Sequence, residues 1–156
     1  MKQLSVQTFR ELLYVMKNIF RAVWGTNGIE GLSGSQFAVM INLYRHGPLS
    51  PSDLSDRMLV TRGNITGLIE RLRKSGWVER RRSSTDRRVL KIALSKSGLA
   101  KLESVIPTWE EAVFNSFHGL KKSELQALFT LTKKLHKSFP GFSAHPHKHG
   151  EPPPEK

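Results

Sequence analysis

The sequence contains no cysteine, and it has no apolar run near the roughly 20 residues that a helix needs to cross a bilayer. The first absence excludes disulfides, thiolate metal ligands and cysteine nucleophiles. The second leaves no candidate membrane span, and the N-terminus also lacks the uninterrupted apolar segment of a signal peptide. We therefore expect a cytoplasmic protein without a membrane partner.

Motifs that carry catalysis are missing as well. The sequence has no glycine-rich phosphate loop, no Gly-x-Ser-x-Gly elbow and no His-Glu-x-x-His pair. His145, His147 and His149 alternate near the C-terminus, but three isolated histidines do not make a closed coordination shell, so we expect a solvated tail rather than a metal site. No enzyme activity, cofactor or metal is predicted.

Acidic residues are scarce, since 13 Asp and Glu stand against 25 Lys and Arg and give a net charge of +12. Such an excess predicts an anionic partner, either nucleic acid or an anionic surface. Nine of the cations lie between Arg71 and Lys91, where only Glu79 and Asp86 oppose them. This concentration favours nucleic-acid binding over a merely solvated charged face.

Apolar residues at three- and four-residue spacing predict a mainly helical chain. A capping box of Ser33 and Gln36 starts one helix, Ser50 can cap a second, and Thr61 and Ser95 cap two more. Pro107 should kink or split the helix that contains it, because it cannot donate a backbone hydrogen bond. The expected helices span residues 4–24, 33–46, 51–59, 61–75, 96–118 and 122–139.

Two strand-like runs, Trp77–Arg82 and Arg88–Leu94, flank a turn at residues 83–87 and predict a basic β-hairpin. Helix, short helix, helix and hairpin in this order form a winged helix-turn-helix. Its recognition helix at 61–75 suits the major groove of duplex DNA, and its wing at 77–94 suits the minor groove.

The chain therefore divides into four predicted regions, which are a dimerisation helix with its linker at 1–32, the DNA-binding domain at 33–94, dimerisation helices at 95–139 and a disordered His- and Pro-rich tail at 140–156. The flanking helices have wide apolar stripes that must be buried. They either complete a monomeric core or pair across a two-fold axis. We expect the homodimer because terminal helices that flank one compact module have little else to cover, and because two recognition helices suit a pseudo-palindromic site.

Five segments in this order resemble the MarR (multiple antibiotic resistance regulator) family: Leu54–Met58, Val60–Leu72, Gly76–Arg80, Asp86–Arg88 and Ile92–Gly98. The resemblance covers residues 5–139. It implies a homodimer that binds inverted-repeat operators and often releases them when a small anionic or aromatic ligand binds. Lys121 stands where the family usually has a Ser or Thr cap, and the tail after Pro140 lies outside the family pattern.

Four polar residues on the recognition helix are candidate DNA contacts: Thr61, Arg62, Asn64 and Thr66. Arginine can pair with guanine, asparagine with adenine, and a threonine methyl group can touch thymine. The alternative for Thr61 and Asn64 is helix capping alone. Gly63 and Gly67 each cost about 1 kcal/mol inside a helix, which indicates a close approach to DNA or to a neighbouring helix unless an exposed face merely tolerates them.

Arginines of the hairpin are the other DNA candidates. Arg88 is the first candidate to enter a narrow minor groove, and Arg87 is the second. The family resemblance implies that Asp86 orients Arg88. The alternative is a surface ion pair that only ties the hairpin. Arg80 and Arg82 are expected to contact phosphates, with Arg81 on the opposite face. Ser35, early in the 33–46 helix, completes the set of DNA candidates.

An effector pocket is predicted from four aromatic residues, Trp24, Phe37, Trp109 and Phe114, for which plain core packing is the competing interpretation. The function we expect is a sequence-specific transcription regulator, a repressor, that binds DNA as a homodimer. One alternative is a sequence-tolerant architectural DNA binder or anti-silencer. The other is a ligand- or metal-binding protein with vestigial DNA contacts.

Overall fold

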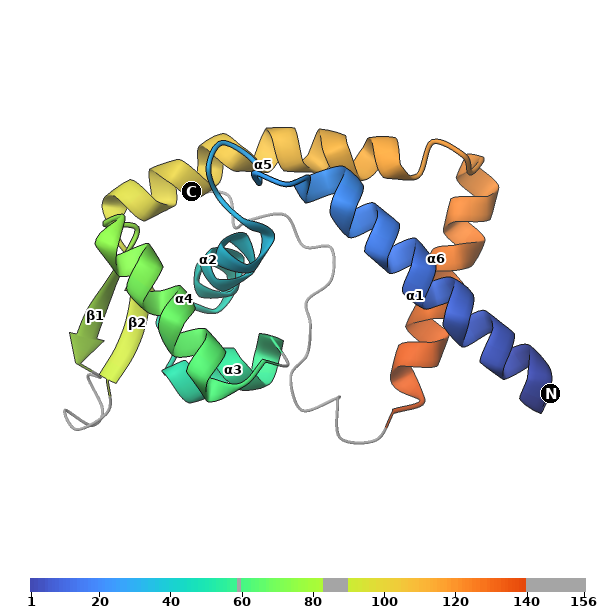
Figure 1. Ribbon diagram of the computed structural model, residues 1–156, viewed down its shortest axis with the longest axis horizontal. Coiled ribbons are helices and arrows are strands. Elements are labelled where there is room, and N and C mark those ends of the chain that lie inside the picture. The colour runs from blue at the N-terminus through green and yellow to red at the C-terminus, as the bar shows by residue number, and fades with distance from the viewer. Residues whose placement is uncertain (59, 83–89, 140–156) are drawn as a thin grey trace. The chain divides into compact units, whose positions relative to one another are not determined.

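A computed structural model describes residues 1–58, 60–82 and 90–139 of the chain. The described part is mainly helical with one antiparallel hairpin, as expected (Figure 1). Its elements are α1 (Lys2–Trp24), α2 (Gly34–His46), α3 (Pro51–Met58), α4 (Arg62–Lys74), β1 (Val78–Arg82), β2 (Leu90–Leu94), α5 (Lys96–Ser116) and α6 (Lys122–Lys137). The chain forms two compact units, Met1–Ser116 and Phe117–Lys156.

Local hydrogen bonds start the helices of the first unit. The Gln36 backbone N–H donates to Ser33 Oγ over 3.3 Å, and the Ser33 N–H donates to Gln36 Oε1 over 3.0 Å, which completes the expected capping box. Ser50 and Asp53 make the same reciprocal pair before α3, with the Asp53 N–H 3.1 Å from Ser50 Oγ. Each cap satisfies backbone donors that a helix leaves free.

The core of the first unit includes the contact of α4 with α2 and α3. Ile65, Leu68, Ile69 and Leu72 form the buried side of α4, and Ile65 and Leu72 are fully buried. Removing a side chain of this size from a packed core typically costs about 2–5 kcal/mol. The opposite side of α4 therefore has a defined orientation toward solvent.

The hairpin pairs Val78 with Leu94, Arg80 with Ile92 and Arg82 with Leu90. Leu49, between α2 and α3, adds a short bridge to Ile92 through backbone hydrogen bonds of 3.0 and 2.7 Å. This bridge ties the base of the hairpin to the helices. The predicted turn at 83–87 and the first residues of the predicted second strand lie outside the described residues.

Helix α5 runs without interruption from Lys96 to Ser116, so Pro107 does not split it, and of the two expected effects the kink stays a prediction. Proline there removes only one backbone donor, and its side chain is exposed. Leu102 and Val105 before it are buried, and Trp109 after it packs against the core, so tertiary contacts hold both halves in one helix.

The linker between α1 and α2 is closely folded rather than extended. Glu30 has a positive φ of 49°, and its carboxylate accepts hydrogen bonds from Lys101 Nζ over 3.0 Å and Ser104 Oγ over 3.3 Å. A Cβ on Gly28, whose φ is 72°, would lie 2.2 Å from the Leu32 carbonyl oxygen. Both positions thus have a left-handed backbone, and at Gly28 the close carbonyl group leaves no room for a side chain.

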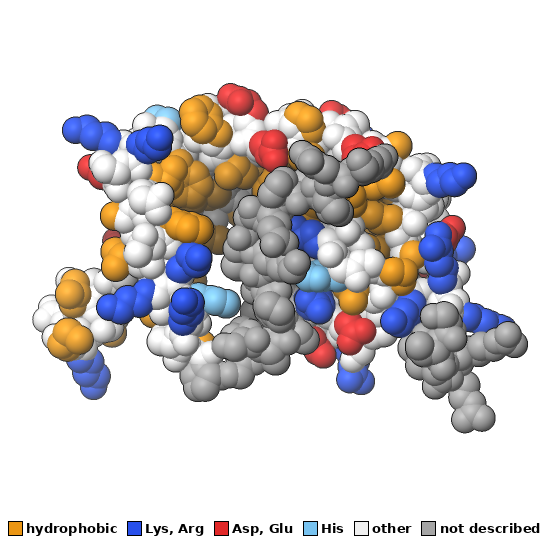
Figure 2. Space-filling view, turned by 180° about the vertical axis from the view of Figure 1, so that it is seen from behind, with side chains coloured by type: hydrophobic (Ala, Val, Ile, Leu, Met, Phe, Trp, Pro, Cys, Tyr) orange, Lys and Arg blue, Asp and Glu red, His pale blue; other side chains and the backbone are white. Residues whose placement is uncertain are grey.

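Two helices leave most of their apolar side chains exposed within their own unit. In α1 only Val23 and Trp24 are buried, while Phe9 is 60% and Leu13 55% exposed. Helix α6 of the second unit buries no residue. Hydrophobic side chains accordingly reach the surface in the space-filling view (Figure 2). None of the described helices is long and apolar enough to span a bilayer.

Helix α6 begins without the Ser or Thr cap that is usual in the resembling family. The Lys121 backbone N–H instead donates to the Glu124 carboxylate over 2.7 Å. A lysine side chain has no acceptor, so this one bond is the cap. Helix α6 ends at Lys137, two residues before the expected Phe139, and α5 ends at Ser116 rather than His118.

Candidate nucleic-acid interface

The side of α4 that faces away from the core carries the predicted recognition residues. Thr61, Arg62, Asn64 and Thr66 are all exposed. Thr61 Oγ1 accepts the Asn64 backbone N–H over 3.3 Å, so Thr61 does cap the helix. Thr66 Oγ1 donates to the Arg62 carbonyl oxygen over 2.9 Å, which leaves its oxygen able to accept and its methyl group exposed.

Arg62 also connects the recognition helix with α3. Its Nη2 lies 3.5 Å from Ser52 Oγ, a distance at the upper limit of a hydrogen bond. The guanidinium is exposed and has most of its donors unoccupied by this contact. Arg62 is therefore placed at the N-terminal end of α4 with donors available for a base or a phosphate.

The two glycines of α4 have open space beside them. A Cβ on Gly63 would meet no atom within 4 Å, and a Cβ on Gly67 would meet only Arg71 Nη1 at 3.6 Å. Packing against a neighbouring helix within the described part of the chain therefore does not require either glycine. The interpretations that remain are close approach of DNA and simple tolerance on an exposed face.

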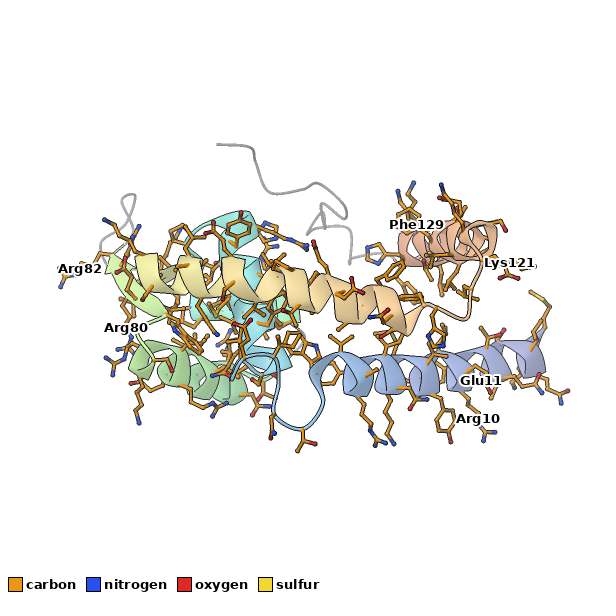
Figure 3. The ribbon with its side chains drawn as sticks, turned by 90° about the horizontal axis from the view of Figure 1, so that it is seen from above. Arg10, Glu11, Arg80, Arg82, Lys121 and Phe129 are labelled. Carbon is orange, nitrogen blue, oxygen red and sulfur yellow. The ribbon has the colours of Figure 1, made fainter. Side chains whose placement is uncertain are left out.

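Arginines of β1 lie on alternating sides of the strand, as predicted. Arg80 lies beside α4, and Arg82 lies toward the outer end of β1 (Figure 3). Arg81 Nε donates to the Glu79 carboxylate over 2.6 Å on the other face. Arg82 has no acidic partner among the described residues, which leaves it available for phosphate.

An ion cluster between α4 and β1 was missed by the sequence analysis. Glu70 Oε1 accepts from Arg73 Nη2 over 2.6 Å and from Arg73 Nε over 3.0 Å, while Glu70 Oε2 accepts from Arg80 Nη2 over 3.4 Å. Hydrogen bonding from Arg73 lowers the pKa of Glu70, and nearby positive charge adds to this effect. The three-residue spacing of Glu70 and Arg73 was a usable signal. The contact with Arg80 depends on the fold.

A pair of hydroxyl groups joins the end of α4 to the start of α5. The sequence predicted the cap at Ser95 but not the contacts with Gly76. Ser95 Oγ and Ser97 Oγ donate to the Gly76 carbonyl oxygen over 2.5 and 2.8 Å. Ser95 Oγ also accepts the Gly98 N–H over 2.9 Å, so its expected role as a cap is confirmed. A Cβ on Gly98 would lie 1.8 Å from the Trp77 carbonyl oxygen. The recognition helix and α5 therefore meet at a tight joint.

Three other DNA candidates cannot be placed, because Asp86, Arg87 and Arg88 lie outside the described residues. Ser35 is exposed in the first turn of α2, two residues after the capping Ser33. Through its contact with Glu70, Arg80 lies against the C-terminal half of α4, whereas the α4 candidates lie in the first turns of the same helix.

Three of the four predicted pocket aromatics are in contact. The ring of Phe37 lies 5.1 Å from that of Trp24 and 5.1 Å from that of Trp109, and Phe37 is only 4% exposed. Phe114 is 72% exposed and lies outside this group. Phe37 itself fits the plain core interpretation.

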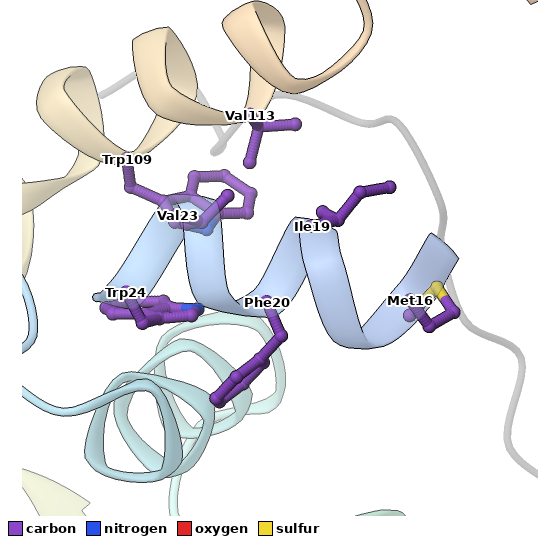
Figure 4. A pocket seen from close by; sticks show the side chains of 7 residues that line it. All are labelled: Met16, Ile19, Phe20, Val23, Trp24, Trp109 and Val113. Atoms are coloured by element: carbon purple, nitrogen blue, oxygen red, sulfur yellow. The ribbon is translucent and has the colours of Figure 1, made fainter. Parts of the chain in front are cut away.

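A hollow of about 190 Å³ lies beside the two tryptophans, between α1 and α5 (Figure 4). Its lining is entirely apolar or aromatic and consists of Met16, Ile19, Phe20, Val23, Trp24, Trp109 and Val113. The predicted Trp24 and Trp109 line it, and Phe37 and Phe114 do not. The five other lining residues were not singled out from sequence, because only the packing of α1 against α5 assembles them.

Comparison with known proteins identifies the family. The model of the MarR family matches residues 32–90, from the end of the linker to the first residue of β2. YkoM, an uncharacterized HTH-type transcriptional regulator of Bacillus subtilis, is 30% identical over 104 residues, which are 67% of this chain and 68% of YkoM. The chain belongs to the MarR family. It is therefore a transcription regulator and not an enzyme.

Other MarR-family relatives include a named repressor. The transcriptional repressor MprA of Escherichia coli K12 is 32% identical over 108 residues, which are 68% of this chain and 61% of MprA. The chain thus spans less than two thirds of the length of that repressor.

Solved structures share the fold of this MarR-family chain. BpsR of Bordetella bronchiseptica is 25% identical with a TM-score of 0.72, and the match covers 83% of this chain and 98% of BpsR. The DNA binding of BpsR is described as regulated by 6-hydroxynicotinic acid. A mutant of MarR from E. coli complexed with operator DNA is 23% identical with a TM-score of 0.75, over 83% of this chain and 94% of MarR. This second likeness concerns the fold alone.

Proposed function

We propose that this MarR-family regulator binds a pseudo-palindromic operator as a homodimer and represses transcription. The observation that carries the proposal is the exposed polar side of α4, which begins at a capped N-terminus and adjoins an arginine-bearing hairpin. An α-helix fits the major groove, where base edges present a distinct pattern for each base pair. MprA, a named repressor, supports the sign of regulation.

In this proposal the recognition helix at 61–75 enters the major groove and the wing at 77–94 reaches the minor groove. Arg62 and Asn64 read base edges, and Thr61, Thr66 and Ser35 contact bases or the backbone. Arg80 and Arg82 neutralise phosphates. Side chains at the wing tip, Arg87 and Arg88 with Asp86 as a brace, act in the minor groove, where arginine responds to groove width.

The dimer is supported by the apolar side chains that α1 and α6 leave exposed. Fully burying a side chain such as Phe9 or Leu13 of α1 contributes about 1.5–3 kcal/mol. Helix α6 adds Leu125, Phe129 and Leu135, which are 39%, 48% and 49% exposed. A second copy that covers these faces also places two recognition helices on one DNA duplex.

Selection of bound DNA from a random pool tests the proposal directly. The expected product is an inverted repeat that the protein binds at least about 1,000-fold more tightly than random duplex. If the dimer neutralises about eight phosphates, the plot of log affinity against log salt should have a slope near −7. A preference near one would instead indicate a sequence-tolerant architectural binder, and a slope near −1 would contradict the proposed interface.

The wing is tested by Arg88→Ala, which we expect to cost roughly 1–3 kcal/mol of operator binding. The reason is the loss of a guanidinium from a groove whose negative potential attracts it. Operator affinity at fixed salt is the measurement, with Arg10→Ala on α1 as the control for a change of charge alone. An unchanged dissociation constant would remove Arg88 from the interface.

Release by a small aromatic or anionic ligand is the remaining part of the proposal. The hollow beside Trp24 and Trp109 supports it, since a cavity of about 150 Å³ is enough to hold a benzene ring. BpsR, whose DNA binding is described as regulated by 6-hydroxynicotinic acid, also supports it. Titration of aromatic carboxylates against the operator complex should lower DNA affinity and quench tryptophan fluorescence in a Trp77→Phe variant. Equal operator binding with and without every such ligand would contradict this part.

We also place the regulator in the cytoplasm with its DNA.

A further inference from the structure

We propose that Glu70 is a positioning residue for DNA binding, which holds Arg73 of α4 and Arg80 of β1 side by side so that both meet the DNA backbone. The inference deepens the proposed function and rests on it. By its charge alone, a carboxylate near DNA would weaken binding. If Glu70 positions the two arginines, its removal should instead lower DNA affinity, so the direction of the change distinguishes the two roles.

The geometry of the cluster supports this role. Glu70 and Arg73 share three contacts of 2.6, 3.0 and 3.2 Å, and the second oxygen of Glu70 lies 3.4 Å from Arg80 Nη2. One carboxylate therefore bridges two guanidinium groups that come from different elements. The side chains remain accessible, with 36% of Glu70, 48% of Arg73 and 52% of Arg80 exposed.

The hydrogen-bond inventory leaves both arginines able to bind phosphate. A guanidinium has five N–H donors. Glu70 engages Nε and Nη2 of Arg73 but only Nη2 of Arg80. The Nη1 group of Arg73, and Nε and Nη1 of Arg80, remain for phosphate oxygens. The cluster also keeps a net charge of +1, so it still attracts DNA.

Holding the two arginines in place lowers the side-chain entropy cost of DNA binding. A free arginine side chain has about 2 kcal/mol of rotamer entropy, part of which disappears when it is fixed on a phosphate. Glu70 fixes Arg73 and Arg80 before DNA arrives. Because the contact also joins α4 to β1, it sets the spacing between the recognition helix and the base of the wing.

The chain offers a matched control in Glu79. This residue also pairs with one arginine, Arg81, is 45% exposed, and lies on β1 beside Arg80. It contacts neither Arg73 nor Arg80 among the described residues. Glu70→Gln and Glu79→Gln therefore remove the same charge from the same region, but only the first releases the arginine pair.

The test measures affinity for the selected operator and for random duplex over a range of salt concentrations, with thermal unfolding recorded for each variant. We expect Glu70→Gln to weaken operator binding by about threefold to tenfold, where tenfold corresponds to roughly 1.4 kcal/mol. The salt slope should become shallower by up to about 0.9 for each phosphate that the variant no longer neutralises. Glu79→Gln should bind DNA as tightly as the wild type or more tightly.

A second background separates positioning from a general structural role. In the Arg73→Gln/Arg80→Gln variant Glu70 has no pair to hold, so adding Glu70→Gln should raise DNA affinity by removing a repulsive charge. Glu70→Gln binding as tightly as the wild type, or raising affinity in both backgrounds, would overturn the inference. Failure of the wild type to bind DNA would overturn the proposed function and this inference together.

Discussion

Gly63 is an exposed residue near the start of α4, where glycine lowers the stability of the helix. Glycine in a helix interior costs about 1 kcal/mol relative to alanine, and no described atom lies near the place of its missing Cβ. The free protein would therefore gain from a side chain at this position. Any benefit of glycine that offsets this cost would therefore arise in the complex with DNA.

We expect Gly63→Ala to raise the free energy of unfolding by up to about 1 kcal/mol and to weaken operator binding. Urea denaturation and operator affinity measured on the same preparation give both values. Unchanged or tighter DNA binding would mean that the exposed face only tolerates the glycine.

The Ser50–Asp53 pair predicts a pH dependence of stability. The hydrogen bond from the Ser50 hydroxyl is the main cause that lowers the pKa of Asp53 from its ordinary 3.8, followed among the lowering effects by the Ser50 backbone N–H and the charges of Arg57 and Lys91. Because the pKa is lower in the folded state, the stabilisation is complete above pH 3.8 and is lost as the pH falls through the folded-state value.

Ser50→Ala should therefore cost about 1 kcal/mol of unfolding free energy at pH 7, as is usual when a helix cap is removed. The difference from the wild type should shrink as the pH falls below 3.8. Urea denaturation at several pH values measures it. A difference that stays constant down to pH 3 would separate the cap from the ionisation of Asp53.

Helices and their joints divide into features that local sequence determines and features that it does not. The caps at Ser33, Ser50 and Thr61 involve residues three positions apart, so residue type and spacing were enough to predict them. The contact of Glu70 with Arg80 and that of Ser97 with Gly76 join residues 10 and 21 positions apart. Such contacts depend on how helices pack, which no local pattern records.

Element boundaries and Pro107 illustrate the same limit. Local sequence predicts a kink or a split at Pro107, yet α5 continues, because the buried Leu102 and Val105 before it and the partly buried Trp109 after it pack against the core. The pocket aromatics were likewise chosen by residue type. Trp24 and Trp109 line the hollow, whereas Phe37 fills the core and Phe114 is exposed.

At the joint between α4 and α5, replacing glycine by alanine should change stability in the opposite direction from the same replacement at Gly63. Gly98→Ala should lower the free energy of unfolding by more than about 1 kcal/mol, since its Cβ would collide with the Trp77 carbonyl oxygen and strain a packed contact. Gly63→Ala, with open space around it, serves as the control. Urea denaturation compares the two. A stabilising Gly98→Ala would show that the joint is loose in solution.

For the whole molecule, the unburied sides of α1 and α6 are the features that a single copy does not explain. Large apolar residues on an exposed helix favour association, and here they extend over most of α1. Phe9 and Leu13 are one turn apart and belong to the same apolar stripe, whereas Arg10 and Glu11 are polar residues between them (Figure 3).

We expect Phe9→Ser/Leu13→Ser to shift the protein toward monomer, because each substitution removes apolar area from the proposed dimer interface. Sedimentation equilibrium gives the association constant, and operator affinity should fall with it. Arg10→Ser on the same helix is the control and should leave the dimer intact. A double variant that remains as dimeric as the wild type would move the interface elsewhere.

The folded linker between α1 and α2 has a mechanical consequence. Glu30 anchors it to α5, and the first residue of α2, Gly34, lies so close to α1 that a Cβ there would come within 2.8 Å of the Phe20 ring. For α1 to move independently of α2, the Glu30 contact would have to break and the Phe20 ring would have to leave Gly34. We therefore expect the linker to couple the two helices and not to act as a hinge.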